Sequence, residues 1–207
     1  MSEQNDLTDL HVQRKLRPKI EDVIPLLVDK NNQQTALDFV AWLRENKMSP
    51  GWGGIHGQWN SNYKGRVICK VSPGDQWWGC TLFLPNIEKY EDIILSENLQ
   101  NFVWDNVIFC VYAPNIDRPA NAPKIKHLAT MGWPCMKASC AISVTICGKV
   151  FDYKCGNGTF RFYQFDNPNE AEIAAIKRLI QLEKQARYEI EEQTKITRNK
   201  MKIKSTN

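Results

Sequence analysis

The sequence predicts an α+β domain: an antiparallel sheet of about five to six strands, flanked by N-terminal helices and a long C-terminal helix. Strand-like segments follow one another in the middle of the chain with short turn signals between them, which favours antiparallel pairing. Apolar residues recur at helical spacing near both ends. The length of 207 residues and the 43% apolar content suit one packed domain and argue against a wholly disordered chain.

The N-terminal region divides into a leader and a first helix. Residues 1–16 lack a sustained apolar pattern, which predicts a flexible leader. Pro18 then suits the first turn of a helix, which Pro25 should shorten or bend. The apolar residues at helical spacing in this stretch are Ile20, Val23, Ile24 and Leu27.

A second helix is expected from Thr35 onward. Thr35 can cap its N-terminus, and Asp38 three residues later resembles a capping box. The helix should end before Ser49, because Pro50 and Gly51 follow. Residues 48–62 contain four glycines, which disfavour a regular helix there.

The clearest strand pair covers residues 65–71 and 77–84. The alternation of apolar residues in the first segment is typical of a strand with one face more buried, and Pro73 with Gly74 is a strong turn signal. Later segments are less regular. We expect an ambiguous stretch at 86–101, strands at 102–112, 141–146, 150–154 and 159–165, and a surface connection at 113–123.

A long helix closes the predicted domain. Asp166 or Asn167 can cap it, and Pro168 follows. Its apolar side consists of Ile173, Ile176, Leu179, Ile180, Leu182 and Ala186. The pattern is diluted beyond Ile190, so we expect one domain over residues 17–190 and a basic tail or frayed helix end over 191–207.

The charge of the chain is concentrated near its C-terminus. The formal net charge is +4, and from Lys195 onward there are five basic residues and no acidic one. The rest is nearly neutral, unlike a typical nucleic-acid-binding domain. A basic tail can contact phosphates non-specifically, although a solvated helix end explains it as well. No apolar run is long enough to cross a bilayer and none resembles a signal peptide, so we expect a cytoplasmic protein without a membrane partner.

Seven cysteines raise the question of a metal site. The odd number and the lack of an export signal disfavour a disulfide framework. The four late cysteines, with His127 as a substitute ligand, have a spacing that zinc could use as a structural site. The alternative is that all four are reduced structural thiols. The four are Cys135, Cys140, Cys147 and Cys155.

A second set of residues suggests a ligand-binding groove in this tryptophan-rich chain. Indole rings can stack on flat or cationic ligands, and the nearby glycines allow a ligand to approach the backbone. Trp77 and Trp78 are adjacent in a predicted strand, so they should point to opposite faces. Alternatively, Trp52 and Trp59 simply cover the end of the core. The residues predicted to bind a ligand are Trp52, His56, Trp59, Trp77 and Trp78.

Catalysis has little support in the sequence. There are three histidines, and the chain contains no GxSxG, Walker A, GxGxxG or HExxH motif. We therefore predict a soluble binding or interaction protein that is not an enzyme, with an unknown small molecule or protein as its partner. The alternatives are a zinc-stabilised module whose basic tail contacts nucleic acid, and a cysteine-dependent enzyme.

The last third of the chain resembles uncharacterised bacterial proteins of clostridial type. The resemblance rests on the several cysteines before the short strand Gly148-Lys149-Val150-Phe151, and on the helix that follows Asn167-Pro168 and contains Ile176-Lys177-Arg178-Leu179-Ile180. It implies a small cytosolic α+β protein. No functional residues are established for such proteins, so none is transferred to this chain.

Overall fold

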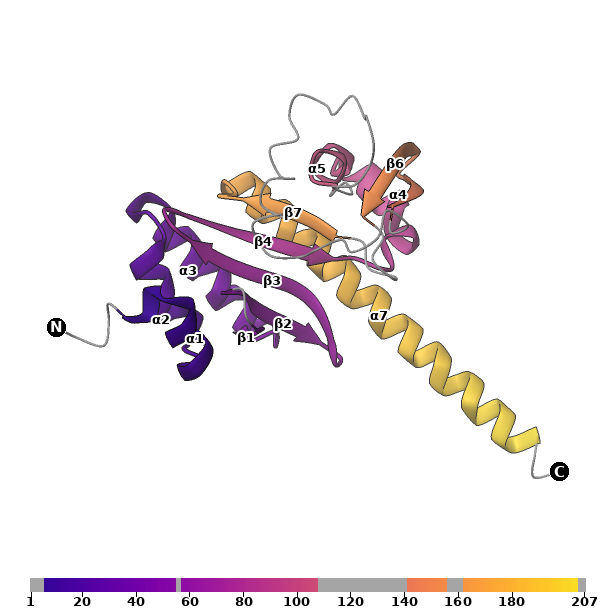
Figure 1. Ribbon diagram of the computed structural model, residues 1–207. Coiled ribbons are helices and arrows are strands. Elements are labelled where there is room, and N and C mark those ends of the chain that lie inside the picture. Colours follow the sequence, from indigo (N-terminus) through magenta and orange to yellow (C-terminus); the bar gives the residue numbers. More distant parts are fainter. Residues whose placement is uncertain (1–5, 55–56, 108–140, 156–161, 205–207) are drawn as a thin grey trace.

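A five-stranded antiparallel sheet with the order β1-β2-β3-β4-β7 forms the centre of the protein, and β5 and β6 form a separate hairpin (Figure 1). The computed structural model describes residues 6–54, 57–107, 141–155 and 162–204. The predicted α+β class is confirmed. The strands are Gly51–Trp52 (β1), Trp59–Tyr63 (β2), Arg66–Gly74 (β3), Trp77–Phe83 (β4), Ala141–Ile146 (β5), Lys149–Cys155 (β6) and Phe162–Asp166 (β7).

Helices precede the sheet, follow β4 and end the chain. None of those in the described part of the chain is long and apolar enough to cross a membrane. The α-helices are Leu10–Leu16 (α1), Ile20–Leu27 (α2), Lys30–Glu45 (α3), Glu91–Ser96 (α4), Gln100–Asp105 (α5) and Glu170–Lys204 (α7). Two short 3-10 helices are Asp6–Thr8 (η1) and Ile87–Tyr90 (η2).

One face of the sheet is covered by α2, α3 and α7. These helices contact β3 and β4, and the rings of Phe39 on α3 and Trp78 on β4 lie 5.7 Å apart. Side chains alternate between the two faces of a strand, so Cys80 and Leu82 point to the same side as Trp78. All three are at most 1% exposed, which makes this layer the main hydrophobic core.

The helices α4 and α5 pack with the β5–β6 hairpin. The indole of Trp104 on α5 donates a hydrogen bond to the Ile146 carbonyl at 2.9 Å, and the Cys147 amide donates to Glu91 of α4 at 3.1 Å. Figure 1 shows this group on the other side of β4 and β7 from α2 and α3. The strands predicted at 141–146 and 150–154 are confirmed within one residue at each end, and they pair as an antiparallel hairpin.

The N-terminal segment is more ordered than the sequence predicted. Residues 6–16 form η1 and α1 rather than a flexible leader. Gln13 is fully buried, and its side-chain amide donates to the Leu7 carbonyl at 2.5 Å. A polar residue that packs in this way adds nothing to an apolar pattern, so the sequence had no periodic signal for the helix.

The helix α3 begins five residues before the predicted cap at Thr35. Asp29 is the actual cap, and its carboxylate accepts hydrogen bonds from the Asn31 amide at 3.0 Å and the Asn32 side chain at 2.6 Å. The first turn reads Lys-Asn-Asn-Gln-Gln and lacks apolar residues, so its helical character comes from capping rather than periodicity. The predicted end before Ser49 is confirmed.

The strand β3 extends through the Pro-Gly pair where the sequence predicted a turn, whereas β4 begins at Trp77 as predicted. Pro73 and Gly74 belong to β3, and the turn consists of Asp75 and Gln76. Gln76 has a positive φ of 61°, and its amide donates to the Leu27 carbonyl of α2 at 2.7 Å. This tertiary hydrogen bond moves the turn beyond the Pro-Gly pair.

The predicted strand at 102–112 is wrong over its first residues, because α5 continues to Asp105. Residues 108–112 lie outside the described part of the chain. Val103 is fully buried and Trp104 contacts the core from this helix. A helix and a strand can both bury these side chains, so the β propensity of the residues did not decide which of the two forms.

The C-terminal helix α7 is confirmed, but its cap is Asn169 rather than Asp166 or Asn167. Asn169 Oδ1 accepts from the Glu172 amide at 3.0 Å, and Glu172 accepts from the Asn169 amide at 2.9 Å, which forms a reciprocal capping box. All six predicted apolar residues are buried. Residues 193–198 are exposed, and this end of the helix projects away from the body of the protein (Figure 1).

Candidate functional site

Two of the predicted ligand-binding tryptophans pack against each other at the β1–β2 end of the sheet. Trp52 and Trp59 meet edge to face, with ring centroids 4.9 Å apart. Trp59 is fully buried, and its indole N–H donates to the Pro18 carbonyl at 3.0 Å. Trp59 therefore covers the core, as the alternative interpretation of these residues expected.

Trp77 and Trp78 point to opposite faces of β4, as the sequence predicted. Trp78 is fully buried beside Phe39 of α3. Trp77 is only partly buried, and its indole lies so close to Gly74 that a methyl group there would fall 2.3 Å from the indole nitrogen. The four described tryptophans of the set therefore occupy three environments, because Trp52 packs with Trp59 while Trp77 and Trp78 lie on opposite faces of β4. His56 lies outside the described residues.

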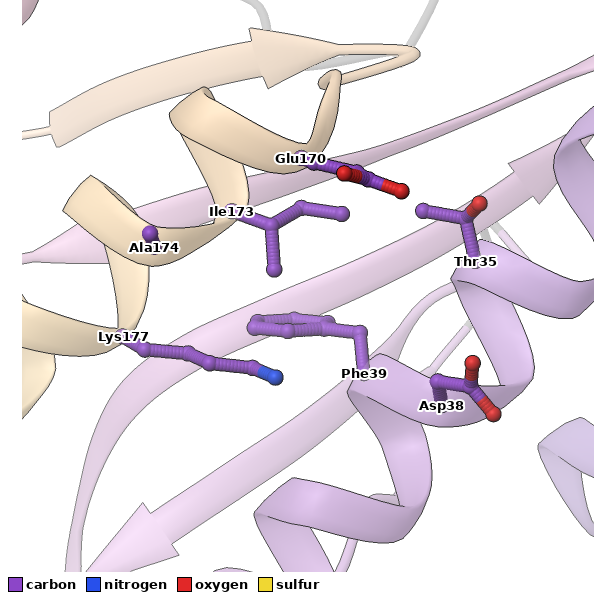
Figure 2. Close-up of a pocket in the computed structure, with 7 residues that line it drawn as sticks. All are labelled: Thr35, Asp38, Phe39, Glu170, Ile173, Ala174 and Lys177. Atoms are coloured by element: carbon purple, nitrogen blue, oxygen red, sulfur yellow. The ribbon is translucent and has the colours of Figure 1, made fainter.

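The described residues form a surface cavity of 280 Å³ between α3 and the first turns of α7. This α3–α7 groove is lined by Thr35, Asp38, Phe39, Glu170, Ile173, Ala174 and Lys177 (Figure 2). Its volume is just below the range of about 300–1,000 Å³ that small-molecule sites usually have. The groove lies directly outside the buried pair of Phe39 and Trp78.

The floor of the groove is apolar. Phe39 and Ile173 are 1% and 8% exposed, and Figure 2 shows the Phe39 ring beneath the Ile173 side chain. Phe39 is also stacked on Trp42 at a centroid distance of 6.1 Å and an interplanar angle of 15°. Packing on both sides holds the aromatic ring in place, so the floor is rigid before any ligand arrives.

The rim of the groove carries charges of both signs. Asp38 accepts a hydrogen bond from Gln34 at 2.7 Å, and Figure 2 shows the Glu170 carboxylate pointing across the groove toward Thr35. Lys177 extends toward α3, and its ammonium nitrogen lies 5.5 Å from the centroid of the Trp42 ring. The two carboxylates outnumber the single ammonium group, so the rim favours a positively charged group in the ligand.

Sequence reasoning did not find this groove, because its two sides are far apart in the chain. Thr35, Asp38 and Phe39 come from α3, and the remaining four residues come from α7. Glu170 is an acid in the first turn of α7, a position that the helix dipole alone would explain. Only the packing of the two helices on one sheet face brings the two carboxylates to a common cavity.

The predicted zinc site receives no support from the described cysteines. Cys147 lies in the turn of the β5–β6 hairpin, and Cys155 ends β6 opposite Ala141. At about 3.3 Å per residue the hairpin separates the two by ~20 Å, whereas two thiolates on one zinc ion lie within about 5 Å of each other. Cys135 and Cys140 lie outside the described residues. Within the described ranges no group of three metal-ligating side chains is found.

Cys147 also lacks the properties of a reactive thiol. The side chain is 4% exposed, and burial, together with the negative charge of Glu91, raises the pKa of the Cys147 thiol to about 11. A nucleophilic or metal-binding cysteine needs the opposite shift. Cys69 and Cys80 are buried in the core and form no disulfide, and a reduced cysteine in such a place packs as a small apolar residue.

The comparisons with known proteins give no relative. No protein-family model, no curated protein and no solved structure matches this chain.

Proposed function

We propose that the protein binds a small organic amine in the α3–α7 groove. The observation that carries this proposal is the pair of carboxylates, Asp38 and Glu170, on the rim of a cavity with an apolar floor. A protonated amine would lie between these carboxylates, and the hydrocarbon part of the ligand would rest on Phe39 and Ile173. The volume of 280 Å³ suits a ligand with one ring or a short chain.

This proposal keeps the predicted class of function and changes the residues. Trp78 supports the groove from below through Phe39, whereas Trp52 and Trp59 pack elsewhere. Lys177 interacts with the face of the Trp42 ring, which directs its charge toward an aromatic ring rather than into the space between the carboxylates. The rim therefore retains its preference for a cation.

Isothermal titration calorimetry with phenethylamine tests the proposal. We expect phenethylamine to bind and 2-phenylethanol, which has the same ring and no charge, to bind at least about tenfold more weakly, ~1.4 kcal/mol. The double variant Asp38→Asn/Glu170→Gln should lose this preference for the amine. Glu45→Gln is the matched control, because Glu45 is an exposed acid on α3 outside the groove.

Equal affinity for the amine and the alcohol would contradict the proposal. The same holds if the double variant binds phenethylamine as well as the original protein does. Thermal melting of both variants shows whether the substitutions disturb the fold.

A further inference from the structure

The face of the sheet opposite α3 and α7 carries a polar cluster that the proposed function does not use. In the strand register, Lys70 of β3 lies between Asn60 of β2 and Thr81 of β4. Ser72 follows two residues later on the same strand and face. Neighbouring side chains on one sheet face lie about 5–8 Å apart, so this cluster has the dimensions of one small molecule.

Two buried oxygen atoms in this cluster have no hydrogen-bond partner among the residues that the structure describes. They are Ser72 Oγ and Asn60 Oδ1. Ser72 is 5% exposed. A buried polar atom without a partner costs about 1–3 kcal/mol, so an unsatisfied pair in one cluster points to a ligand that completes it.

Lys70 supplies the positive charge of the cluster. Its ammonium nitrogen lies 5.4 Å from the centroid of the Phe83 ring, and partial burial lowers the pKa of Lys70 to about 8. The ionisable side chains that the register places on this face of the described strands are Tyr63 of β2, Arg66 of β3 and Asp166 of β7, while uncharged Asn60 and Thr81 lie directly beside Lys70. A bound anion would favour the charged form of Lys70.

Trp77 forms an aromatic wall next to the cluster. Its indole lies over Gly74 and Gly79, where an added methyl group would approach ring atoms to 2.3 Å and 2.9 Å respectively. Gly79 is paired with Ser72 in the register, so the indole reaches the row next to Lys70. The absence of side chains at the two glycines is what allows the ring to lie down on the sheet.

We propose that Asn60, Lys70, Ser72 and Trp77 form a second binding site, for a small hydroxy carboxylate with an apolar or aromatic part. The Lys70 ammonium and the Ser72 hydroxyl hold the carboxylate, the ligand hydroxyl donates to Asn60 Oδ1, and the hydrocarbon part packs on Trp77. A carboxylate fits better than a phosphate dianion, because a second negative charge would lie near Asp166 on the same face.

Titration calorimetry with mandelate, phenylacetate and inorganic phosphate tests this site. Mandelate and phenylacetate differ only by the hydroxyl group, so we expect mandelate to bind at least about fivefold more tightly, ~1 kcal/mol. Phosphate should bind more weakly than either. In the original protein the affinity for mandelate should be constant below pH 7 and should fall about tenfold per pH unit above pH 8, as Lys70 loses its proton.

Variants of Lys70 separate a binding role from a structural one. Lys70→Arg stays charged at high pH, so it should still bind mandelate at pH 9.5, whereas Lys70→Met should not bind at any pH. Lys89→Met is the control, because Lys89 is an exposed lysine on η2. Ser72→Ala should weaken binding of both carboxylates, and Asn60→Leu should remove the preference for mandelate.

Two results would overturn the proposal. One is an affinity of the original protein for mandelate that stays constant between pH 7 and pH 9.5. The other is an affinity of Lys70→Met for mandelate equal to that of the original protein. The pH profile needs no variant, so it decides the question even if Lys70→Met does not fold. Phenethylamine binding in the α3–α7 groove should be unaffected by Lys70→Arg, so a failure here is distinguishable from a failure of the proposed function.

Discussion

Buried tryptophans in this protein differ in whether their indole N–H has a partner. The Trp59 N–H donates to the Pro18 carbonyl at 3.0 Å, whereas the Trp78 N–H is buried without a hydrogen-bond partner among the described residues. Both side chains are fully buried, so replacement by phenylalanine removes a similar volume at each position. The difference between the two variants therefore reports the hydrogen bond.

We expect Trp59→Phe to lower the free energy of unfolding by about 1–3 kcal/mol more than Trp78→Phe does. Trp59→Phe leaves the Pro18 carbonyl without its donor, while Trp78→Phe removes a polar group that has no partner. Urea denaturation followed by circular dichroism measures both values. Equal losses for the two variants would show that the Trp59–Pro18 hydrogen bond contributes no net stability.

The buried thiol of Cys147 should make the free energy of unfolding depend on pH in the alkaline range. Its pKa is raised from 9.0 to about 11 in the folded protein, mainly by burial and then by the charge of Glu91. Below pH 9 the thiol is neutral in the folded and in the unfolded chain, so its ionisation does not change the free energy of unfolding. Between pH 9 and pH 11 only the unfolded chain ionises this thiol, so the free energy of unfolding falls as the pH rises.

Replacement by alanine isolates this contribution of Cys147. In Cys147→Ala the decline of the melting temperature between pH 9 and pH 11 should be less steep than in the original protein. Cys69→Ala is a suitable comparison, because it removes a buried thiol from β3. A parallel decline in the original protein and in Cys147→Ala would refute the expectation.

Among the elements, α7 has two parts with different roles. Its first half buries four large aliphatic side chains against the sheet and α3, namely Ile173, Ile176, Leu179 and Ile180. Its second half projects from the body (Figure 1), and Ile196 and Met201 are 53% and 59% exposed there. Lys64 of the β2–β3 turn pairs with Glu191, which is an exposed contact and stabilises little.

A truncation series measures this division of α7. A chain that ends after Thr194 should melt cooperatively, with a melting temperature close to that of the full chain. A chain that ends after Glu172 loses all four aliphatic side chains, at about 1.5–3 kcal/mol each, which approaches or exceeds a typical stability of about 5–15 kcal/mol. Circular dichroism should show that this shorter chain is unfolded. A cooperative melting transition would contradict the conclusion that the first half of α7 is needed for the fold.

At the scale of the whole molecule, a buried ion pair on α7 joins four parts of the fold. Glu183 is fully buried and accepts hydrogen bonds from Asn86 and Tyr90 at the start and end of η2. Arg187 donates to Glu183 at 2.8 Å and to backbone carbonyls of β3 and β4, including those of Val67 and Phe83 at 3.2 Å. Apart from the Glu183–Arg187 pair itself, the partners in this network lie far from α7 in the sequence.

Removal of the arginine should destabilise the whole domain. In Arg187→Met the Glu183 carboxylate stays buried without its cation, which costs about 3–5 kcal/mol. Arg178→Met is the matched control, because Arg178 of α7 forms a carboxylate–guanidinium pair with Glu97, the residue after α4, and this pair is exposed to solvent. We expect a large drop in urea midpoint for the first variant and a small one for the second; equal drops would show that the buried network is not the stronger link.

The sequence by itself determined those features that depend on neighbouring residues. The apolar period of α7, the hairpin around Cys147 and Gly148, and the opposite directions of Trp77 and Trp78 all follow from local spacing, and the structure has all of them. The α+β class follows in the same way, because short turns between adjacent strands leave antiparallel pairing as the simplest arrangement.

Tertiary structure alone decided the turn at Asp75–Gln76, the helical state of α5 and both proposed sites. The turn depends on a hydrogen bond to Leu27. The α3–α7 groove depends on two helices that pack on one sheet face and whose groove-lining residues are more than 130 positions apart in the sequence. The polar cluster at Lys70 depends on the register of three strands. Contacts of this kind join residues whose proximity no local pattern encodes, because the sheet on which they meet exists only after the chain has folded.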